Sequence, residues 1–107
     1  MLTLGQYYTG KVYNDYNEEH WCSPHCLSGL DKADVLVDPW TTGYYDSRYA
    51  RYDGSDWNLS DETPGYSTDQ LGGYASKFIE EQAQSDKPFL AIIAPVAPHR
   101  PNFPKHE

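Results

Sequence analysis

The feature that most constrains the fold of this chain is one continuous apolar run, Phe-Leu-Ala-Ile-Ile-Ala, from Phe89 to Ala94. Its residues do not alternate with polar ones, which is the pattern of a strand covered on both faces in a parallel sheet. One strand cannot form a core by itself. Any fold that contains this run must therefore supply a layer of structure on each side of it.

The rest of the chain offers little apolar material for such layers. Hydrophobic residues make up 38% of the 107 residues, and they include ten Tyr and three Trp. The mean hydropathy is -0.78. Buried Tyr and Trp need hydrogen-bond partners for their polar tips, so a self-sufficient core is difficult to build from them. We predict that residues 1–107 are a single incomplete piece of a larger domain, and the alternative is an intact but loop-rich small domain.

A helix is predicted from Ser67, which we expect to be the N-cap of a capping box with Gln70. Gly72 and Gly73 each weaken this helix by roughly 1 kcal/mol relative to Ala, so it depends on packing. A helix followed by a doubly buried strand is half of a βαβ unit, and it predicts an α/β sheet protein. The apolar stripe of the helix comprises Leu71, Tyr74, Ala75, Phe78, Ile79 and Ala83.

The remaining sequence predicts shorter elements. Leu4 to Thr9 and Ala33 to Asp38 are expected to form short strands. Tyr44 to Tyr52 fits either a strand or a packed loop, and Asp53 to Gly65 is expected to be a loop. The stretch from Val12 to Thr42 has no sustained period and predicts an aromatic-rich loop excursion.

Charge disfavours two classes of partner. The net charge is -8 and no Lys/Arg cluster exists to neutralise a phosphate backbone, so we expect no nucleic-acid binding. No apolar stretch approaches the roughly 20 residues of a spanning helix, so we expect no membrane insertion. The sequence also lacks the basic and then apolar pattern of a signal peptide at its start.

Two residues stand where an α/β sheet normally binds its ligands, beyond the carboxyl ends of strands. His99 follows the apolar run in a loop that three prolines between residues 95 and 101 stiffen. Histidine can bind an anion when protonated, or donate a proton to a leaving oxygen. Lys11 follows the predicted strand and turn at residues 7–10 and would suit an anionic substrate. The alternatives are a surface His in a proline-rich loop and a solvated Lys.

Together these features resemble the middle of the formylglycine-dependent sulfatases, particularly the arylsulfatase and N-acetylglucosamine-6-sulfatase-like branch. The likeness covers nearly the whole chain. Its segments, in order, are Tyr-Tyr-Thr-Gly-Lys-Val-Tyr-Asn (7–14), Ala-Asp-Val-Leu-Val-Asp-Pro-Trp (33–40), Gly-Tyr-Ser-Thr-Asp-Gln-Leu (65–71), Lys-Pro-Phe-Leu (87–90) and Ala-Pro-Val-Ala-Pro-His-Arg-Pro (94–101).

The resemblance implies that residues 1–107 are a single incomplete piece of a sulfatase N-terminal catalytic domain. That domain is expected to be an alkaline-phosphatase-like α/β/α sandwich that acts on aryl or sugar sulfate esters. The resemblance also implies a calcium ion and a formylglycine whose hydrate attacks sulfur. Lys11 matches the sulfate-binding lysine of the family, and Asn14 falls in the same pocket segment. His99 matches the histidine that contacts sulfate and faces the leaving-group oxygen. A cation beside sulfate would offset charge that develops in the transition state.

The departures from the family pattern concern the nucleophile and the metal. The family's maturation motif is Cys or Ser followed by x-Pro-x-Arg, and it lies upstream of the Gly-Lys segment. Residues 22–26, Cys-Ser-Pro-His-Cys, look similar but follow Lys11 and place Cys26 where Arg should be. The resemblance places the calcium ligands outside residues 1–107 as well, so we expect no metal ligands in this chain and no activity from it alone.

Cys22 and Cys26 could form a small-loop disulfide or remain thiols. Asn58-Leu59-Ser60 fits the acceptor pattern for N-glycosylation. The family resemblance implies a secreted or extracellular glycoprotein.

Three rival functions remain open at this stage. His20 and His25 could join the two cysteines around a zinc ion, although the spacing fits no usual zinc pattern. A phosphatase or phosphodiesterase of the same superfamily would bind a similar tetrahedral oxyanion. A carbohydrate-binding surface could use an aromatic platform made of Tyr44, Tyr45, Tyr49, Tyr52 and Trp57.

Overall fold

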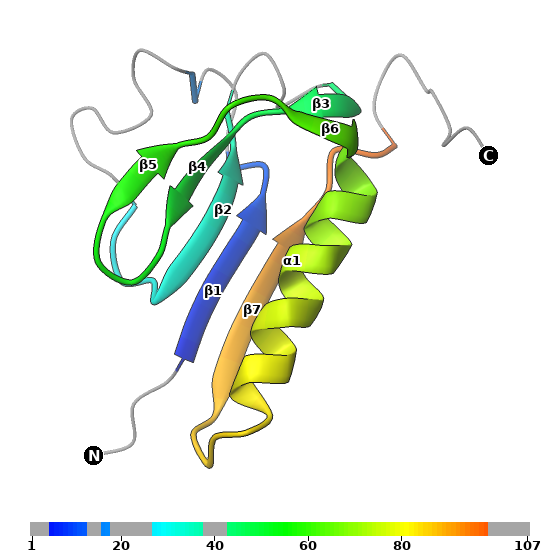
Figure 1. The fold of residues 1–107 in the computed structure, drawn as a ribbon. Coiled ribbons are helices and arrows are strands. Elements are labelled where there is room, and N and C mark those ends of the chain that lie inside the picture. The colour runs from blue at the N-terminus through cyan, green and yellow to red at the C-terminus, as the bar shows by residue number, and fades with distance from the viewer. Residues whose placement is uncertain (1–4, 13–15, 18–26, 38–42, 99–107) are drawn as a thin grey trace.

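The computed structural model describes residues 5–12, 16–17, 27–37 and 43–98, which form a mixed α/β structure (Figure 1). The described elements are β1 (Gly5–Gly10), β2 (Lys32–Leu36), β3 (Tyr45–Ser47), β4 (Tyr49–Tyr52), β5 (Trp57–Leu59), β6 (Thr63–Tyr66), α1 (Ser67–Gln82) and β7 (Phe89–Ala94). The predicted α/β class is therefore confirmed at this level.

The main sheet has five strands in the order β5-β4-β2-β1-β7. Strand β1 runs parallel to both of its neighbours, β2 and β7, whereas β4 pairs antiparallel with both β2 and β5. A smaller sheet pairs β3 with β6. Helix α1 packs on one face of the main sheet, over β1 and β7 (Figure 1). Alternate residues of each strand therefore point toward α1 or away from it.

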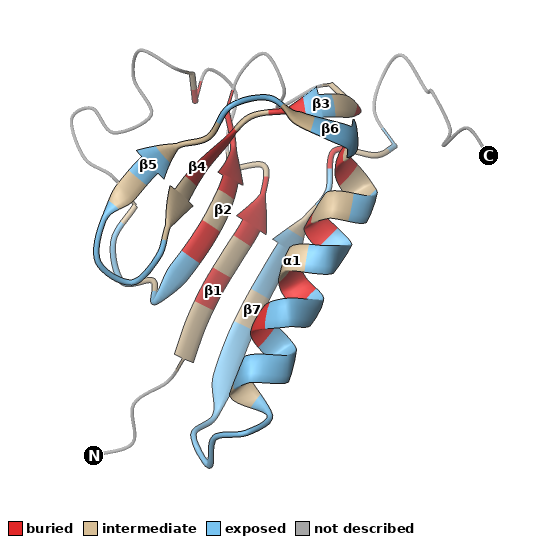
Figure 2. Ribbon diagram, viewed as in Figure 1, coloured by how far each residue is buried: buried red, intermediate tan, exposed pale blue. Residues whose placement is uncertain are grey.

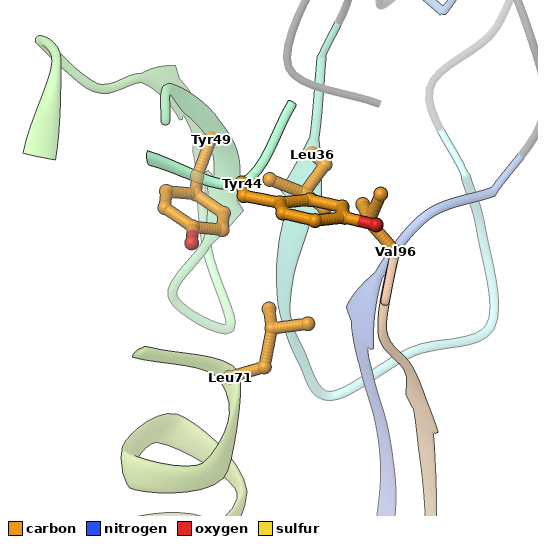
Figure 3. Close-up of a cluster of buried hydrophobic side chains, with 5 residues drawn as sticks. All are labelled: Leu36, Tyr44, Tyr49, Leu71 and Val96. Carbon is orange, nitrogen blue, oxygen red and sulfur yellow. The ribbon is translucent and has the colours of Figure 1, made fainter. Parts of the chain in front are cut away.

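The core is divided between these two faces. On the helix face, Tyr7 stacks on Phe78 with ring centroids 4.7 Å apart. On the opposite face, Ala33 and Val35 pack with the buried Tyr16. A third cluster joins the first turns of α1 to β4 and to the segment after β7, and it consists of Leu36, Tyr44, Tyr49, Leu71 and Val96 (Figure 3).

The start of α1 differs from the predicted capping box. Tyr66 is the N-cap residue, and Ser67 is already helical and makes no side-chain cap. The backbone N–H of Ser67 donates instead to the carbonyl of Tyr44 at 2.6 Å. Gln70 accepts a hydrogen bond from the hydroxyl of Tyr49 at 2.6 Å and donates to the carbonyl of Thr63 at 2.8 Å. Contacts with other elements have therefore replaced the local cap.

The short strands predicted near Leu4 to Thr9 and Ala33 to Asp38 are confirmed as β1 and β2. Tyr44 to Tyr52 contains two short strands, β3 and β4, with Arg48 between them. The predicted loop from Asp53 to Gly65 is wrong, because it contains β5 and most of β6. Trp57 pairs with Tyr52 across β4 and β5, and the two rings stack at 5.2 Å. The local acids and glycine favour a loop, but the cross-strand pairing of these two aromatic rings stabilises strands here.

Strand β7 is not the doubly covered strand that its sequence predicts. It lies at the end of the sheet order, and among the described residues it pairs with β1 alone. Its four large side chains, at positions 89, 90, 92 and 93, are between 39% and 47% exposed (Figure 2). Ile79, which belongs to the predicted apolar stripe of α1, is also exposed. The described residues therefore do not supply the two covering layers that the apolar sequence of β7 predicts.

We predict that Tyr49→Phe lowers the free energy of unfolding by about 1–2 kcal/mol. The substitution keeps the ring in the core but removes the hydroxyl donor to Gln70. Urea unfolding followed by circular dichroism measures the change. A loss below about 0.3 kcal/mol would show that this hydrogen bond does not help to hold α1 against β4.

Candidate functional site

The carboxyl ends of β1 and β7 meet at one edge of the sheet. Gly10, the last residue of β1, is in register with Ala94, the last residue of β7. The backbone N–H of Lys11 donates to the carbonyl of Ala94 at 2.9 Å. From Ala94 the described chain continues to Pro98, the residue before His99. The segment that leads to His99 therefore leaves the sheet beside Lys11.

Gly10 makes this close approach possible. Its φ of +111° lies in the left-handed region, which residues with a side chain rarely adopt. A Cβ atom at Gly10 would also collide with the carbonyl oxygen of Ala94. The hydroxyl of Tyr8 donates to the carbonyl of Lys11 at 2.5 Å, so both backbone polar groups of Lys11 are engaged. The Lys11 side chain is half-buried at this edge.

Helix α1 begins near the same edge of the sheet, where β7 ends (Figure 1). Leu71 in its first turns packs in one cluster with Val96, two residues beyond β7. A helix N-terminus carries a partial positive charge from its aligned peptide dipoles. The edge that carries Lys11 therefore also has a helix end that favours negative charge.

Of the predicted site residues, the structure places two. Lys11 lies at the strand end described above, and Asn58 lies exposed in β5, where a glycan could be accommodated. The other four predicted residues lie outside the described residues, and they are His99, Asn14, Cys22 and Cys26. The pairing of Lys11 with His99 therefore stays a prediction.

No metal site is found among the described residues, which contain no group of three or more His, Cys, Asp or Glu side chains able to hold an ion. The calcium ion implied by the family resemblance has no ligand set in this part of the chain. The possible zinc ligands at positions 20, 22, 25 and 26 lie outside the described residues. The described residues also include no helix that is both long and apolar enough to cross a membrane.

The sequence did not predict a groove between α1 and the strands β2 and β4, with a volume of about 340 Å³. Asp34 of β2 lies in it, and its carboxylate accepts a hydrogen bond from the hydroxyl of Tyr7 at 2.6 Å. The guanidinium of Arg51 bonds to the same carboxylate at 3.2 Å and to the hydroxyl of Tyr74 at 2.8 Å. These contacts tie the helix to both strands.

The charges in the groove are balanced within this network. Burial raises the pKa of Asp34, although the Tyr7 hydroxyl and the Arg51 charge act in the opposite direction. Burial and the nearby Asp34 carboxylate raise the pKa of Tyr7. The Arg51 guanidinium also lies over the Tyr74 ring, 4.8 Å from its centre. We interpret the network as the connection that orients α1 on the sheet.

A local signal for this network exists in the sequence. Asp34 is a lone acid within Ala-Asp-Val-Leu-Val, and strand alternation puts it on the face opposite to Ala33 and Val35. Its partner Arg51 is set by the antiparallel register of β2 and β4, which pairs these two positions. A register of this kind cannot be read from one sequence, because it depends on the connection between the strands.

The aromatic residues proposed as a carbohydrate platform do not form one exposed surface. Tyr44 and Tyr49 are buried in the core cluster at the start of α1. Tyr52 and Trp57 stack on each other and pack against the cluster on the other face of the sheet. A sugar ring could not reach the buried faces of the first two rings.

Comparison with curated proteins relates the chain to a sulfatase. A curated arylsulfatase from Volvox carteri is 35% identical over 99 residues, which are 92% of this chain. The match supports a sulfatase-related origin for this chain. The chain spans only 14% of the length of that relative. No protein-family profile matches the chain. The general resemblance to sulfatases is thus confirmed over most of this chain, which matches a short region of the relative. The assignment to the arylsulfatase and N-acetylglucosamine-6-sulfatase-like branch stays a prediction.

We predict that Gly10→Ala lowers the free energy of unfolding by at least about 2 kcal/mol, because it combines an unfavourable φ with a collision against backbone. Gly73→Ala is the matched control. Its added Cβ meets no atom within 4 Å, so we expect a gain of about 0.5–1 kcal/mol from helix propensity. Urea unfolding of both variants measures the change in the free energy of unfolding. Equal changes for Gly10→Ala and Gly73→Ala would contradict the close approach of Gly10 and Ala94.

Asp34 also gives a prediction for pH. Its raised pKa means that the folded chain binds this proton more tightly than the unfolded chain does. The contribution of Asp34 to stability is therefore full below its ordinary pKa, near 4, and declines as the pH rises through its folded pKa. Relative to Asp34→Asn, which does not titrate, the wild type should lose stability as the pH rises above about 4.

Asp53 is the control of opposite sign. Backbone N–H groups of Asp56 and Ser55 bond to its exposed carboxylate and lower its pKa. Relative to Asp53→Asn, the wild type should therefore lose stability as the pH falls through the folded pKa of Asp53. Urea titrations at several pH values measure both differences. Slopes of the same sign for the two positions would refute the assignment for Asp34.

Proposed function

We propose that this chain is the part of a sulfatase-type catalytic domain that supplies sulfate-binding residues. The observation that carries the proposal is the contact between Lys11 and Ala94, which brings the segment before His99 to the strand end that bears Lys11. The arylsulfatase relative supports the choice of sulfate ester as the substrate, with aryl or sugar sulfates as the class. The sulfate would lie beyond the carboxyl ends of two parallel strands, the usual ligand position in such sheets.

Each proposed residue has a defined task. The ammonium group of Lys11 binds a sulfate oxygen and offsets the negative charge that develops there in the transition state. The imidazole of His99 contacts the sulfate and donates a proton to the leaving alcohol oxygen. Asn14, three residues after Lys11, contributes a polar group to the same pocket. The N-terminus of α1 adds a favourable field at this edge.

The parent domain in this proposal is an alkaline-phosphatase-like α/β/α sandwich, of which the described sheet and α1 are one part. The described residues hold no ligand set that fits the implied calcium ion. The ion is assigned in this proposal to sequence outside the chain, as the family resemblance implies. The formylglycine nucleophile is assigned to outside sequence as well, because residues 22–26 lack the arginine of the maturation motif. The chain alone is therefore proposed to be inactive. A secreted location and a glycan on Asn58 belong to the same proposal.

The test is a chimera in which this chain replaces the matched 99-residue segment of the Volvox carteri arylsulfatase. Its hydrolysis of 4-nitrophenyl sulfate is compared with that of Lys11→Ala and His99→Ala chimeras. We expect each substitution to lower kcat/KM by about 10²–10⁴-fold without changing the circular dichroism spectrum. The isolated chain should show no hydrolysis above background.

Lys87→Ala is the charge control for this experiment, because Lys87 is exposed just before β7, at the opposite end of that strand from Lys11. It should change kcat/KM by less than about threefold. Hydrolysis by the isolated chain would contradict the proposal. So would Lys11→Ala and His99→Ala chimeras as active as the chimera with both residues intact.

A further inference from the structure

The outer edge of β7 is unlike a normal sheet edge. Natural edge strands carry charges, prolines or bulges that prevent further pairing, or they are covered. The six residues of β7 contain no charge and no proline, and within the described part of the chain their backbone bonds to β1 on one side only. On the helix face, Tyr7 of β1 is buried, and its register partner on β7, Ala91, is half-buried against the same cluster. Phe89 and Ile93, the other two β7 residues on this face, are exposed. Burial on the helix face therefore decreases from β1 to β7.

The flank of α1 beside this edge is also uncharged. Leu71, Ala75 and Phe78 face the sheet, and Tyr74, Lys77 and Glu81 line the groove over β2 and β4. At 100° per residue, the opposite flank of the helix is the one toward the free edge of β7. The residues of that flank are all exposed, and they are Gly72, Ser76, Ile79 and Ala83.

We name the exposed strand and this uncharged helix flank together the β7 seam. It consists of the outer edge of β7 with Phe89, Leu90, Ile92 and Ile93, together with the flank of α1 that contains Gly72, Ser76, Ile79 and Ala83. Phe89 and Ile93 lie on the face of β7 that carries α1, and Leu90 and Ile92 lie on its other face. A Cβ atom at Gly72 would meet no atom within 4 Å, so nothing in this chain requires a glycine there. A small residue would, however, allow a second helix to approach α1 closely.

We propose that the β7 seam is occupied by a further strand and its crossover helix, supplied by the part of the sulfatase-type domain that lies outside this chain. This inference rests on the proposed function. The relative is about seven times longer than the segment that it shares with this chain, so ample sequence exists to supply the unit. The continuous apolar run of β7 favours a parallel neighbour, and parallel strands require a crossover connection.

The position of the incoming helix follows from the handedness of such connections. Crossovers between parallel strands are right-handed in nearly all sheets. The step from β1 to β7 places α1 on one face, and a further step in the same direction places the next helix on that same face. The new helix therefore packs beside α1, against the flank with Gly72 and Ile79, while the new strand pairs with the free edge of β7.

Hydrogen exchange provides the first test. In the isolated chain the amide groups of residues 89–94 that point away from β1 should exchange quickly. In the Volvox carteri chimera they should exchange at least about 100-fold more slowly, because the added strand accepts their hydrogen bonds. Exchange at the same rate in both proteins would overturn the proposal. Protection in the isolated chain that disappears on dilution would assign the edge to a second copy and overturn it too.

Two neighbouring glycines provide a matched pair of variants. Gly72 lies on the seam, and Gly73 lies 100° further round the helix, toward solvent, with open space at both positions. In the isolated chain Gly72→Gln and Gly73→Gln should each raise the melting temperature by about 3–6 °C, through helix propensity. In the chimera Gly73→Gln should still raise it, whereas Gly72→Gln should lower it by about 2–4 °C because of the adjacent helix.

These outcomes separate the seam from the sulfate site. If the two glutamine variants behave alike in the chimera, or the chimera fails to fold where the Volvox carteri protein folds, the seam proposal is overturned. A chimera with protected β7 amides and opposite glutamine effects, but no hydrolysis of 4-nitrophenyl sulfate, supports the seam and counts against the sulfate site.

Discussion

The structure depends on the parallel pairing of β1 with β7. This pairing joins residues that are more than 80 positions apart and sets the register that brings Gly10 level with Ala94. At its carboxyl end, the absent side chain of Gly10 lets the two backbones approach, and the N–H of Lys11 completes the contact at the carbonyl of Ala94. The same pairing provides the surface on which α1 packs, with Tyr7 stacked on Phe78. The candidate anion site and the helix layer are therefore consequences of one strand pair.

The groove network gives α1 its place on this pair. Asp34 is held by hydroxyl and guanidinium donors from β1 and β4, and Arg51 extends the connection to Tyr74 on the helix. A desolvated carboxylate of this kind adds little net stability, because the cost of burial offsets much of the attraction. It does penalise arrangements in which Arg51 or Tyr7 lies elsewhere, since they would leave a buried charge without a partner. The ion pair between Lys32 and Glu81 at the rim is exposed and contributes little.

Local patterns were sufficient to predict β1, β2, the body of α1 and β7, because each has a clear apolar period or run. They failed where partners distant in sequence decide the structure. Ser67 was expected to cap the helix, yet Tyr44 and Tyr49 supply the contacts at that end. Of the candidate site, Lys11 could be predicted from its position after a strand, whereas the Asp34–Arg51 pair required the register of β2 and β4. The expected burial of β7 is not provided by the described residues, and we propose that the missing layers pack on the β7 seam.

The central claim is that one oxyanion contacts both Lys11 and His99. A crystal structure of the chain, alone or within the Volvox carteri chimera, soaked with tungstate as a sulfate analogue would test it most directly. The account predicts a single anion within about 3 Å of both the Lys11 ammonium nitrogen and a ring nitrogen of His99. Side chains on opposite faces of the sheet, or more than about 10 Å apart with no shared anion, would contradict it.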